Sequence, residues 1–356
     1  MSAERRLLSR PDGLPCWHFQ HGPIDLVIVA DGHASAVADA FDAAWRRFES
    51  VLCELVGELP ALRRPVALAC PVQGVIAQRM WQACAPFQAG FITPMAAVAG
   101  AVAQELIACF ERSGVRRAWV NNGGDIALHL APGTSARVGL FADLARFDPR
   151  ASSVRTDADF IVHAALPVRG VATSGWRGRS FSLGIADSVT VLALTAAQAD
   201  AAATVIANAV NVIDARIERR AAKALVDDSD LGDIEVIVGV PVLDRAQVDA
   251  ALQAGRLRAL ELQRLGLIHS AVLVCQRRFV AIGVLAFIDD PPLQGAHRLA
   301  SRCRSVGSAH APRKPPSPQP SPARGRGRGR NPSRVGALGG RAHRSAPSPA
   351  RGRGLG

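Results

Sequence analysis

FITPMAAVAGAVAQELIACFERSGVRRAWVNNGGDIALHL, residues 91–130, predicts a small-residue helix that leads into two strands joined by a glycine turn. Thr93 can cap this helix and Pro94 suits its first position, because both residue types favour helix N-termini. The run that follows is almost all Ala, Val and Met and contains Gly100, so neighbouring backbone or a flat ligand can approach closely. We expect the helix to stop at Gly114.

A glycine turn lies between the expected strands at 117–120 and 126–130, and it reads Asn121-Asn122-Gly123-Gly124-Asp125. Two glycines allow positive φ and leave backbone N–H groups uncovered. Such a turn beside a small-residue helix can cradle a nucleotide, with N–H donors for phosphate and the Asp125 carboxylate for a hydroxyl or a metal. The alternative is an ordinary β-hairpin with an Asn-Gly turn.

The charge of the chain is unevenly distributed. The 356 residues carry a formal charge of +12, but fourteen of the 42 Lys and Arg residues fall in 291–356, a stretch without Asp or Glu. The remaining 28 basic residues face 30 acidic ones, so the body of the chain is close to neutral. No broad basic field therefore recruits nucleic acid to the body.

The cysteines and the N-terminal segment indicate the cellular compartment in which the protein resides. The seven cysteines are scattered, odd in number and free of C-x-x-C spacing, which argues against a disulfide framework and a zinc site. The N-terminal MSAERRLLSRPDG lacks an apolar core, and no later run has the length of a transmembrane helix. We predict a cytoplasmic protein that makes no contact with a membrane.

Hydrophobic periodicity predicts the individual helices and strands, and we expect an α+β fold in which Ala-rich helices back mixed, largely antiparallel sheets. Pro60 should end the first helix, and Thr195 with Gln198 has the form of a capping box. A connection is expected at 143–155 and a solvated acidic loop at 227–233. The other expected strands are 24–30, 136–141, 159–165, 168–174, 187–194, 234–240 and the hairpin 270–275 with 279–283, and the expected helices are 34–59, 75–85, 196–216 and 244–265.

Three segments of the chain differ in character. We expect an N-terminal extension at 1–23, an α+β domain of two intertwined subdomains at 24–290, and a disordered tail at 291–356 made of Pro, Gly, Ser, Ala and Arg. The octamer PSPARGRG occurs twice in the tail, at 320–327 and 347–354. The tail is interpreted as an RNA-binding segment, a solvated end or, the interpretation we favour, a translated DNA repeat.

Three motifs in order resemble the ApbE-like superfamily, whose characterised members are FAD:protein FMN transferases. They are the helix from Pro94 with the turn NGGDI at 122–126, the segment VATSG at 171–175, and DSVTV at 187–191 followed by ADAAAT at 199–204. The segments GRSFSLGIADSVTVLA, SDLGD and GLI are similar to an uncharacterised branch of that superfamily. The resemblance covers roughly residues 30–285 and implies the ApbE-like fold.

The resemblance also implies a cofactor and its ligands. Family enzymes hold FAD and a hard divalent ion, split the pyrophosphate and pass FMN to a Ser or Thr of an acceptor protein. The residues that match the metal ligands are Asp200 and Thr204, which lie one helical turn apart and offer the oxygen atoms that Mg²⁺ prefers. Asp187 could add charge near the ion. The alternative is that Thr204 bonds its own helix backbone while Asp200 faces water.

A polar segment after the VATS strand is a candidate for phosphate and ring binding. Its hydroxyl and N–H groups would lie beside a phosphate, its arginines suit phosphate or carboxylate, and its tryptophan can stack on a ring. The alternatives are a plain strand end and exposed, solubilising arginines. The residues are Thr173, Ser174, Gly175, Trp176, Arg177 and Arg179.

Two departures from the family pattern separate the functional hypotheses. Ala99 stands where the family carries a Lys, and the segment 179–186 is short and lacks the family's His. The first hypothesis is a Mg²⁺-assisted enzyme that acts on a flavin nucleotide or a related ligand through Asp200. The second is a non-catalytic module that keeps the pocket for a cofactor or small metabolite, and the third is RNA binding through the tail.

Overall fold

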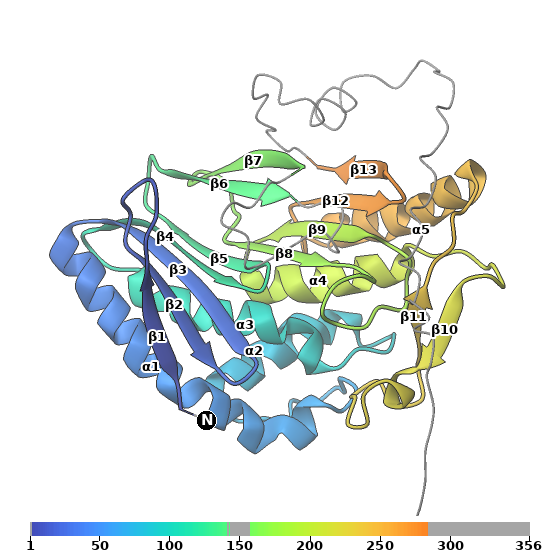
Figure 1. Cartoon of the computed structure of the whole chain (residues 1–356), viewed down its shortest axis with the longest axis horizontal. Coiled ribbons are helices and arrows are strands. Elements are labelled where there is room, and N and C mark those ends of the chain that lie inside the picture. Colours follow the sequence, from blue (N-terminus) through green and yellow to red (C-terminus); the bar gives the residue numbers. More distant parts are fainter. Residues whose placement is uncertain (1, 141, 143–156, 284–356) are drawn as a thin grey trace, which may run out of the picture. The chain divides into compact units, whose positions relative to one another are not determined.

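A nine-stranded sheet forms the centre of the computed structural model, which describes residues 2–140, 142 and 157–283 (Figure 1). Among the described strands, every pairing is antiparallel. In spatial order the strands of the large sheet are β1 (Glu4–Leu8), β2 (Cys16–His21), β3 (Ile24–Gly32), β4 (Val115–Asn122), β5 (Asp125–Leu130), β8 (Gly170–Ser174), β9 (Ser188–Ala193), β12 (Ser270–Cys275) and β13 (Arg278–Ile282). The expected α+β class with antiparallel sheets is confirmed.

Residues 4–21, which the sequence analysis set apart as an extension, form β1 and β2 of this sheet. β2 pairs along its whole length with β3, from Cys16 opposite Val29 to His21 opposite Ile24. Phe19 of β2 is fully buried against the core. The N-terminal segment is therefore continuous with the central sheet.

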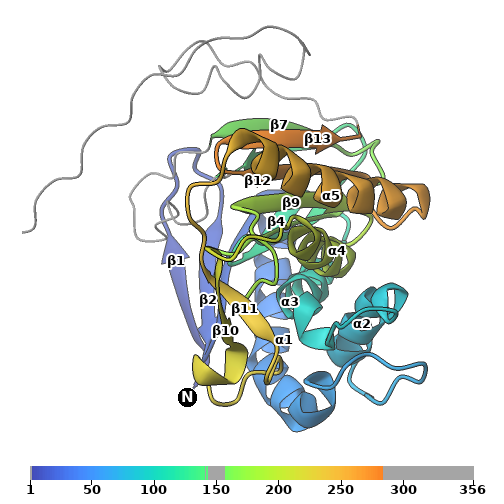
Figure 2. The ribbon, with the colours of Figure 1, turned by 90° about the vertical axis from the view of Figure 1, so that its right-hand side faces the viewer.

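The helices cover one face of the sheet (Figure 2). They are α1 (Ala34–Leu62), α2 (Val75–Cys84), α3 (Val98–Ile107), α4 (Ala196–Ala209) and α5 (Arg245–Arg264), with short 3-10 turns η1 (Ala85–Phe87), η2 (Pro94–Ala97), η3 (Ala108–Phe110) and η5 (Ala222–Ala224). α4 buries seven alanines along its length, and these small side chains allow α3 and strands β8 and β9 to pack closely on it. The main hydrophobic core lies between this layer and the sheet.

The opposite face of the sheet carries a second core. A two-stranded ribbon of β6 (Ser135–Leu140) and β7 (Ala158–His163) packs there through Leu140, Phe160 and Val162, against Leu192 and Val272 of the large sheet.

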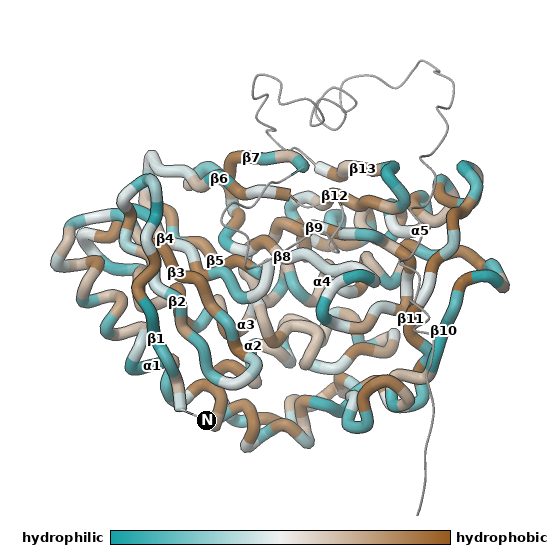
Figure 3. Tube along the Cα trace, viewed as in Figure 1, coloured by the Kyte–Doolittle hydropathy of each residue, from teal (hydrophilic) through white to brown (hydrophobic). Residues whose placement is uncertain are grey.

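A second ribbon pairs β10 (Glu218–Ala221) with β11 (Glu235–Gly239). Figure 3 shows the central strands β9 and β12 in hydrophobic brown and β10 in hydrophilic teal. One continuous nine-stranded sheet thus runs through the described residues, and the division of 24–290 into two intertwined subdomains stays a prediction.

Several element boundaries differ from the expected ones for physical reasons. Pro60 does not end α1 but lies in its last turn, where the Arg63 N–H still reaches the Leu59 carbonyl. The long helix expected at 196–216 ends at Ala209. At Val210 the backbone leaves the helical conformation, and its carbonyl accepts a hydrogen bond from the Ile185 N–H. Thr195 caps α4 through the Gln198 N–H, at 3.3 Å, as expected.

The helix expected to run from Pro94 to Gly114 is also shorter. It begins as η2, continues as α3 and finishes in η3 at Phe110. Thr93 makes no capping hydrogen bond; its Oγ1 instead donates to Asp230 Oδ2 at 2.5 Å. Thr93 thus occupies the expected N-cap position before Pro94, but its side chain does not cap the helix, because its hydroxyl bonds to a carboxylate of the acidic loop. The connection 143–155 and the tail 291–356 lie outside the described residues.

Candidate functional site

The glycine turn between β4 and β5 is a tight hairpin. Gly123 and Gly124 have φ angles of 66° and 115°, the left-handed region that glycine tolerates best. We had expected the backbone N–H groups of this turn to be uncovered. The Gly124 N–H instead donates a hydrogen bond to Asn121 Oδ1 at 2.8 Å. The arginine of the glycine-rich loop, Arg179, lies with its guanidinium directly over Gly123, in space that a side chain at 123 would fill.

Asp125 bridges a gap in the sheet. β5 and β8 pair only at Ile126 with Val171 and at Ala127 with Gly170. Beyond these pairs the Thr173 N–H donates to Asp125 Oδ1 at 3.2 Å, so a side chain takes over from the backbone ladder. Ala127 belongs to the helix-side core, and alternation along β5 therefore points Asp125 toward α3 and α4.

Asp200 approaches the same place from α4. Its Oδ2 accepts from the Gly100 N–H at 2.9 Å, at the start of α3. The first turn of α3 needs an external acceptor, because its N-cap residue, Ala97, makes no side-chain hydrogen bond. A Cβ at Gly100 would collide with the Ala196 carbonyl oxygen and lie 2.9 Å from Asp200 Cβ. The glycine thus allows α3 and α4 to meet at the carboxylate.

The two carboxyl groups influence each other. Burial raises the pKa of Asp125 to about 7, although the Thr173 N–H and the Arg179 guanidinium favour its charged form. Burial and then the neighbouring Asp125 raise the pKa of Asp200 well above its usual range, against the N–H groups of Gly100 and Ala99. Two half-buried carboxyls on different elements therefore lie close enough that the charge of Asp125 disfavours the charged form of Asp200.

Four other residues that the sequence predicted for this site lie on the hairpin, on α4 and on β8. Asn122 is buried and donates from Nδ2 to the Ala99 carbonyl at 3.1 Å, so it contacts protein backbone. Thr204 lies one turn after Asp200 on α4. Ser174 ends β8 on the same face as the core residue Ala172. Thr173 points to the other face, where its hydroxyl lies 3.0 Å from Thr190 Oγ1.

Trp176, Arg177 and Asp187 form a separate cluster. The Trp176 Nε1–H donates to Asp187 Oδ1 at 3.3 Å, and the Arg177 guanidinium lies 4.8 Å from the centre of the indole ring. Asp187 is buried, and its Oδ2 accepts from the Gln276 N–H at 2.5 Å. Both oxygens of Asp187 are therefore engaged with protein groups, and its role as an additional metal ligand stays a prediction.

Sequence reasoning missed two neighbours of the site. Cys84, fully buried at the end of α2, lies close enough to Asp200 that burial and this carboxylate both raise the pKa of its thiol. A single cysteine in an apolar helix gives no sequence signal of such a contact. Asn121, which holds the turn through Gly124, could have been found, because Asn before a glycine turn commonly bonds to the backbone that follows.

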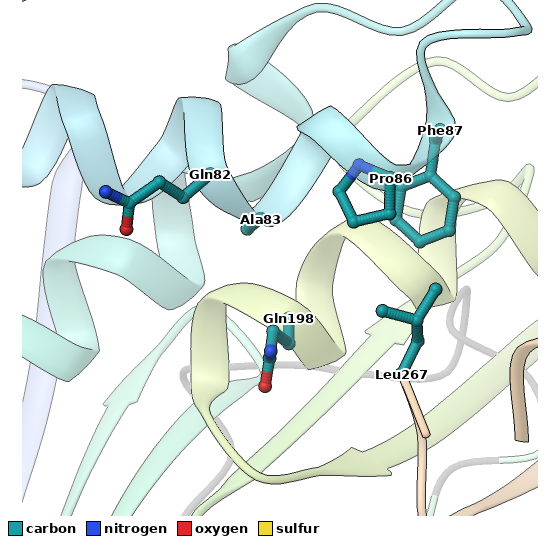
Figure 4. Close-up of a pocket in the computed structure, with 6 residues that line it drawn as sticks. All are labelled: Gln82, Ala83, Pro86, Phe87, Gln198 and Leu267. Carbon is teal, nitrogen blue, oxygen red and sulfur yellow. The ribbon is translucent and has the colours of Figure 1, made fainter. Parts of the chain in front are cut away.

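Two cavities of the described residues lie away from this pair of carboxylates. Gln82, Ala83, Pro86 and Phe87, at the end of α2 and just after it, enclose with Gln198 and Leu267 a cavity of about 20 Å³ (Figure 4). This volume suits one water molecule. A second, open hollow of about 550 Å³ lies at the opposite end of β4 and β5 from the glycine turn, around residues 111–115 and 129–132. Neither includes Asp125 or Asp200.

Two absences concern the described part of the chain only. Within it, no group of three or more His, Cys, Asp or Glu side chains is placed to hold a metal, so any ion at the site would rest on the two carboxylates and other oxygen atoms. None of the helices in the same residues has the length and apolar character needed to cross a bilayer. The six cysteines described are all free thiols, as expected.

Comparison with known proteins gives a consistent family. The family described as "AbpE bacteria" matches residues 5–285. A UPF0280 protein of Methanopyrus kandleri is 33% identical over 247 residues, which cover 67% of this chain and 94% of the relative. A UPF0280 protein of Methanothermobacter thermautotrophicus is 42% identical over 121 residues, 34% of this chain and 43% of the relative, so the match spans less than half of that protein's length.

Among solved structures, the apo form of the Pseudomonas stutzeri flavinyl transferase ApbE aligns with 79% of this chain and 93% of its own. The TM-score is 0.39 and the sequence identity is 13%.

Proposed function

We propose, on the premise that this chain belongs to the family described as AbpE bacteria, that it binds a flavin nucleotide together with a divalent cation. The observation that carries the proposal is the proximity of two half-buried carboxyls, Asp125 and Asp200, which is close enough for the charge of Asp125 to raise the pKa of Asp200. Two carboxylates that repel each other at a half-buried place are stabilised when a cation lies between them. The choice of a flavin nucleotide as the ligand rests on the three motifs, which occur in the same order as in FAD:protein FMN transferases.

The donor set fits a hard cation, with Mg²⁺ as the expected ion. Mg²⁺ in proteins is commonly held by one or two carboxylates together with substrate phosphates and water. Asp125 and Asp200 would supply the carboxylates, and Thr204 a hydroxyl from the next turn of α4. A bound ion would neutralise charge on the ligand's pyrophosphate. The guanidinium of Arg179, which lies over the glycine turn, is the candidate partner for a phosphate oxygen.

The finer activity is cleavage of the FAD pyrophosphate. Attack by water would give FMN and AMP, whereas attack by a Ser or Thr hydroxyl of an acceptor protein would give FMN esterified to that protein, and AMP. The second candidate is binding without turnover. It is favoured by Ala99, which stands where the family has a Lys, and by the absence of His from 179–186.

The test uses the full chain, FAD and Mg²⁺. Flavin fluorescence measures binding with and without the ion, and chromatography measures AMP. We expect Asp200→Asn to weaken Mg²⁺-dependent FAD binding at least tenfold, on the order of the effect of losing a metal ligand's support. The control is Asp42→Asn, which removes a carboxylate from an exposed ion pair with Arg5 and should change binding less than twofold. If the wild-type chain binds no FAD at any Mg²⁺ concentration, the proposal is wrong; binding without AMP release selects the second candidate.

A further inference from the structure

One peptide group connects the glycine hairpin to Asp200. The Asn122 side-chain amide donates to the Ala99 carbonyl at 3.1 Å, and the Gly100 N–H donates to Asp200 Oδ2 at 2.9 Å. The Ala99 carbonyl and the Gly100 N–H belong to the same peptide bond, which is planar, so fixing one end fixes the direction of the other. Asn122 and Asp200 therefore hold opposite ends of a single rigid group.

We infer that Asn122 is a positioning residue for Asp200, acting through the Ala99–Gly100 peptide. Asn122 is 6% exposed, and its amide would lose a hydrogen bond in a buried place if the peptide rotated. A hydrogen bond to a peptide carbonyl also polarises the N–H at the other end, which strengthens the bond to the carboxylate. The assignment rests on the proposed function, because it gives Asp200 a divalent ion to hold.

The hydrogen bonds of the Ala99–Gly100 peptide oppose the charge repulsion between Asp125 and Asp200. Without a cation, the charge of Asp125 disfavours the charged form of Asp200, and this repulsion favours a larger separation of the two carboxylates. The N–H groups of Gly100 and Ala99 oppose such a separation, because they donate hydrogen bonds to Asp200. Asn122 lies three residues before Asp125 on the same hairpin, so one tight turn both carries Asp125 and fixes the peptide that holds Asp200. The hairpin thereby sets the spacing of the two carboxylates before an ion arrives.

The chain provides a matched pair of variants to test this. Asn122→Asp removes the donor to Ala99, whereas Asn121→Asp keeps an acceptor for the Gly124 N–H. Both add one negative charge to the same hairpin at adjacent positions, and that charge alone would favour a cation. A loss of cation affinity at position 122 thus cannot be an effect of net charge. Asn122→Ala, which removes the donor without adding charge, is the second variant.

Two readouts are measured on the full chain at pH 8. Hydrogen exchange followed by mass spectrometry, in chelator, reports the peptides that contain residues 97–103. Mn²⁺ titration followed by electron paramagnetic resonance, with and without FAD, reports the ion without requiring turnover. We expect Asn122→Asp and Asn122→Ala to speed exchange at the start of α3 and to weaken Mn²⁺ binding about 10–100-fold, the usual effect of losing a group that orients a metal ligand. Asn121→Asp should leave exchange at the start of α3 unchanged and should not weaken Mn²⁺ binding.

The outcomes separate this inference from the proposed function. If the wild-type chain binds no Mn²⁺, the proposed function fails and the positioning role fails with it. If the wild-type chain binds Mn²⁺ and both variants at position 122 bind it equally well, only the positioning role is overturned, even when exchange is faster. Thermal melting of each variant shows whether it is folded, and a folded variant with intact Mn²⁺ binding decides against the inference.

Discussion

At the scale of single residues, the pKa of Asp125 predicts how stability depends on pH. Burial raises this pKa from 3.8 to about 7 in the folded protein. Well below pH 3.8 the carboxyl is neutral in both the folded and the unfolded chain. As the pH rises from about 4 through 7, the unfolded chain releases this proton more readily, so the free energy of unfolding falls. In chelator, Asp125→Asn should therefore be more stable than wild type at pH 8, with the difference closing toward pH 4.

Thermal melting at several pH values between 4 and 8 measures this difference. Asp12 provides a control of opposite sign, because its hydrogen bond with Arg10 lowers its pKa to about 2. Asp12→Asn should be slightly less stable than wild type at pH 7, and the difference should shrink as the pH falls toward 2. A stability gap for Asp125→Asn that stays constant from pH 4 to 8 would contradict the assignment of a raised pKa.

The same residues show what sequence could predict about the site. The chemistry of the glycine turn and of the arginine-containing loop was visible in the sequence and led to Asp125 and Arg179, whereas Asp200 was named only because its position matches a metal ligand of the family that the chain resembles. Their contacts were not visible. Asn122 had been assigned to a ligand but bonds to Ala99, 23 residues earlier, because only the packing of the hairpin on α3 brings the two together.

At the scale of elements, the packing of α3 on α4 depends on Gly100. Gly100→Ala would direct a methyl group at the Ala196 carbonyl and at Asp200 Cβ, both backbone or near-backbone atoms that cannot move alone. Although alanine favours a helix over glycine, we expect this variant to lower the free energy of unfolding by about 1–3 kcal/mol, the usual range for overpacking. It should also weaken Mn²⁺ binding, because α4 carries Asp200.

The matched control is Gly57→Ala in α1, where an added methyl group meets no atom within 4 Å. There the substitution should stabilise the chain by about 0.5–1 kcal/mol, since glycine in a helix is unfavourable. Urea unfolding measures both variants. Equal stability of the two alanine variants would mean that α3 and α4 do not approach as closely as the structure places them.

Element types were more predictable than element ends. Alternation and helical periodicity found the five α-helices and, apart from β10, the strands from β3 to β13, because most of these elements bury one apolar face. The ends of the helices depended on partners distant in sequence. The Thr93 hydroxyl donates to Asp230, and the Val210 carbonyl accepts from the Ile185 N–H. Such partners, 137 and 25 residues away in sequence, leave no local signal.

At the scale of the whole molecule, the question is whether residues 291–356 contribute to the function of the body. The family match ends at residue 285, and the last described strand of the large sheet, β13, ends at Ile282. All the acidic residues lie before 291, whereas fourteen of the basic residues lie after 290. Removal of the tail therefore changes the net charge from +12 to −2 while leaving every residue of the proposed site in place.

We predict that the chain truncated after residue 290 binds FAD and Mn²⁺ with the affinity of the full chain, within about twofold. Binding of an RNA homopolymer, if the full chain shows any, should disappear on truncation, and in the full chain its logarithm should fall linearly with the logarithm of salt concentration, because released counterions drive it. Fluorescence titration at three salt concentrations distinguishes the cases. RNA binding that survives truncation would place a nucleic-acid site on a body of net charge −2, which the even balance of its charges argues against. Loss of FAD binding on truncation would instead make the tail part of the flavin site.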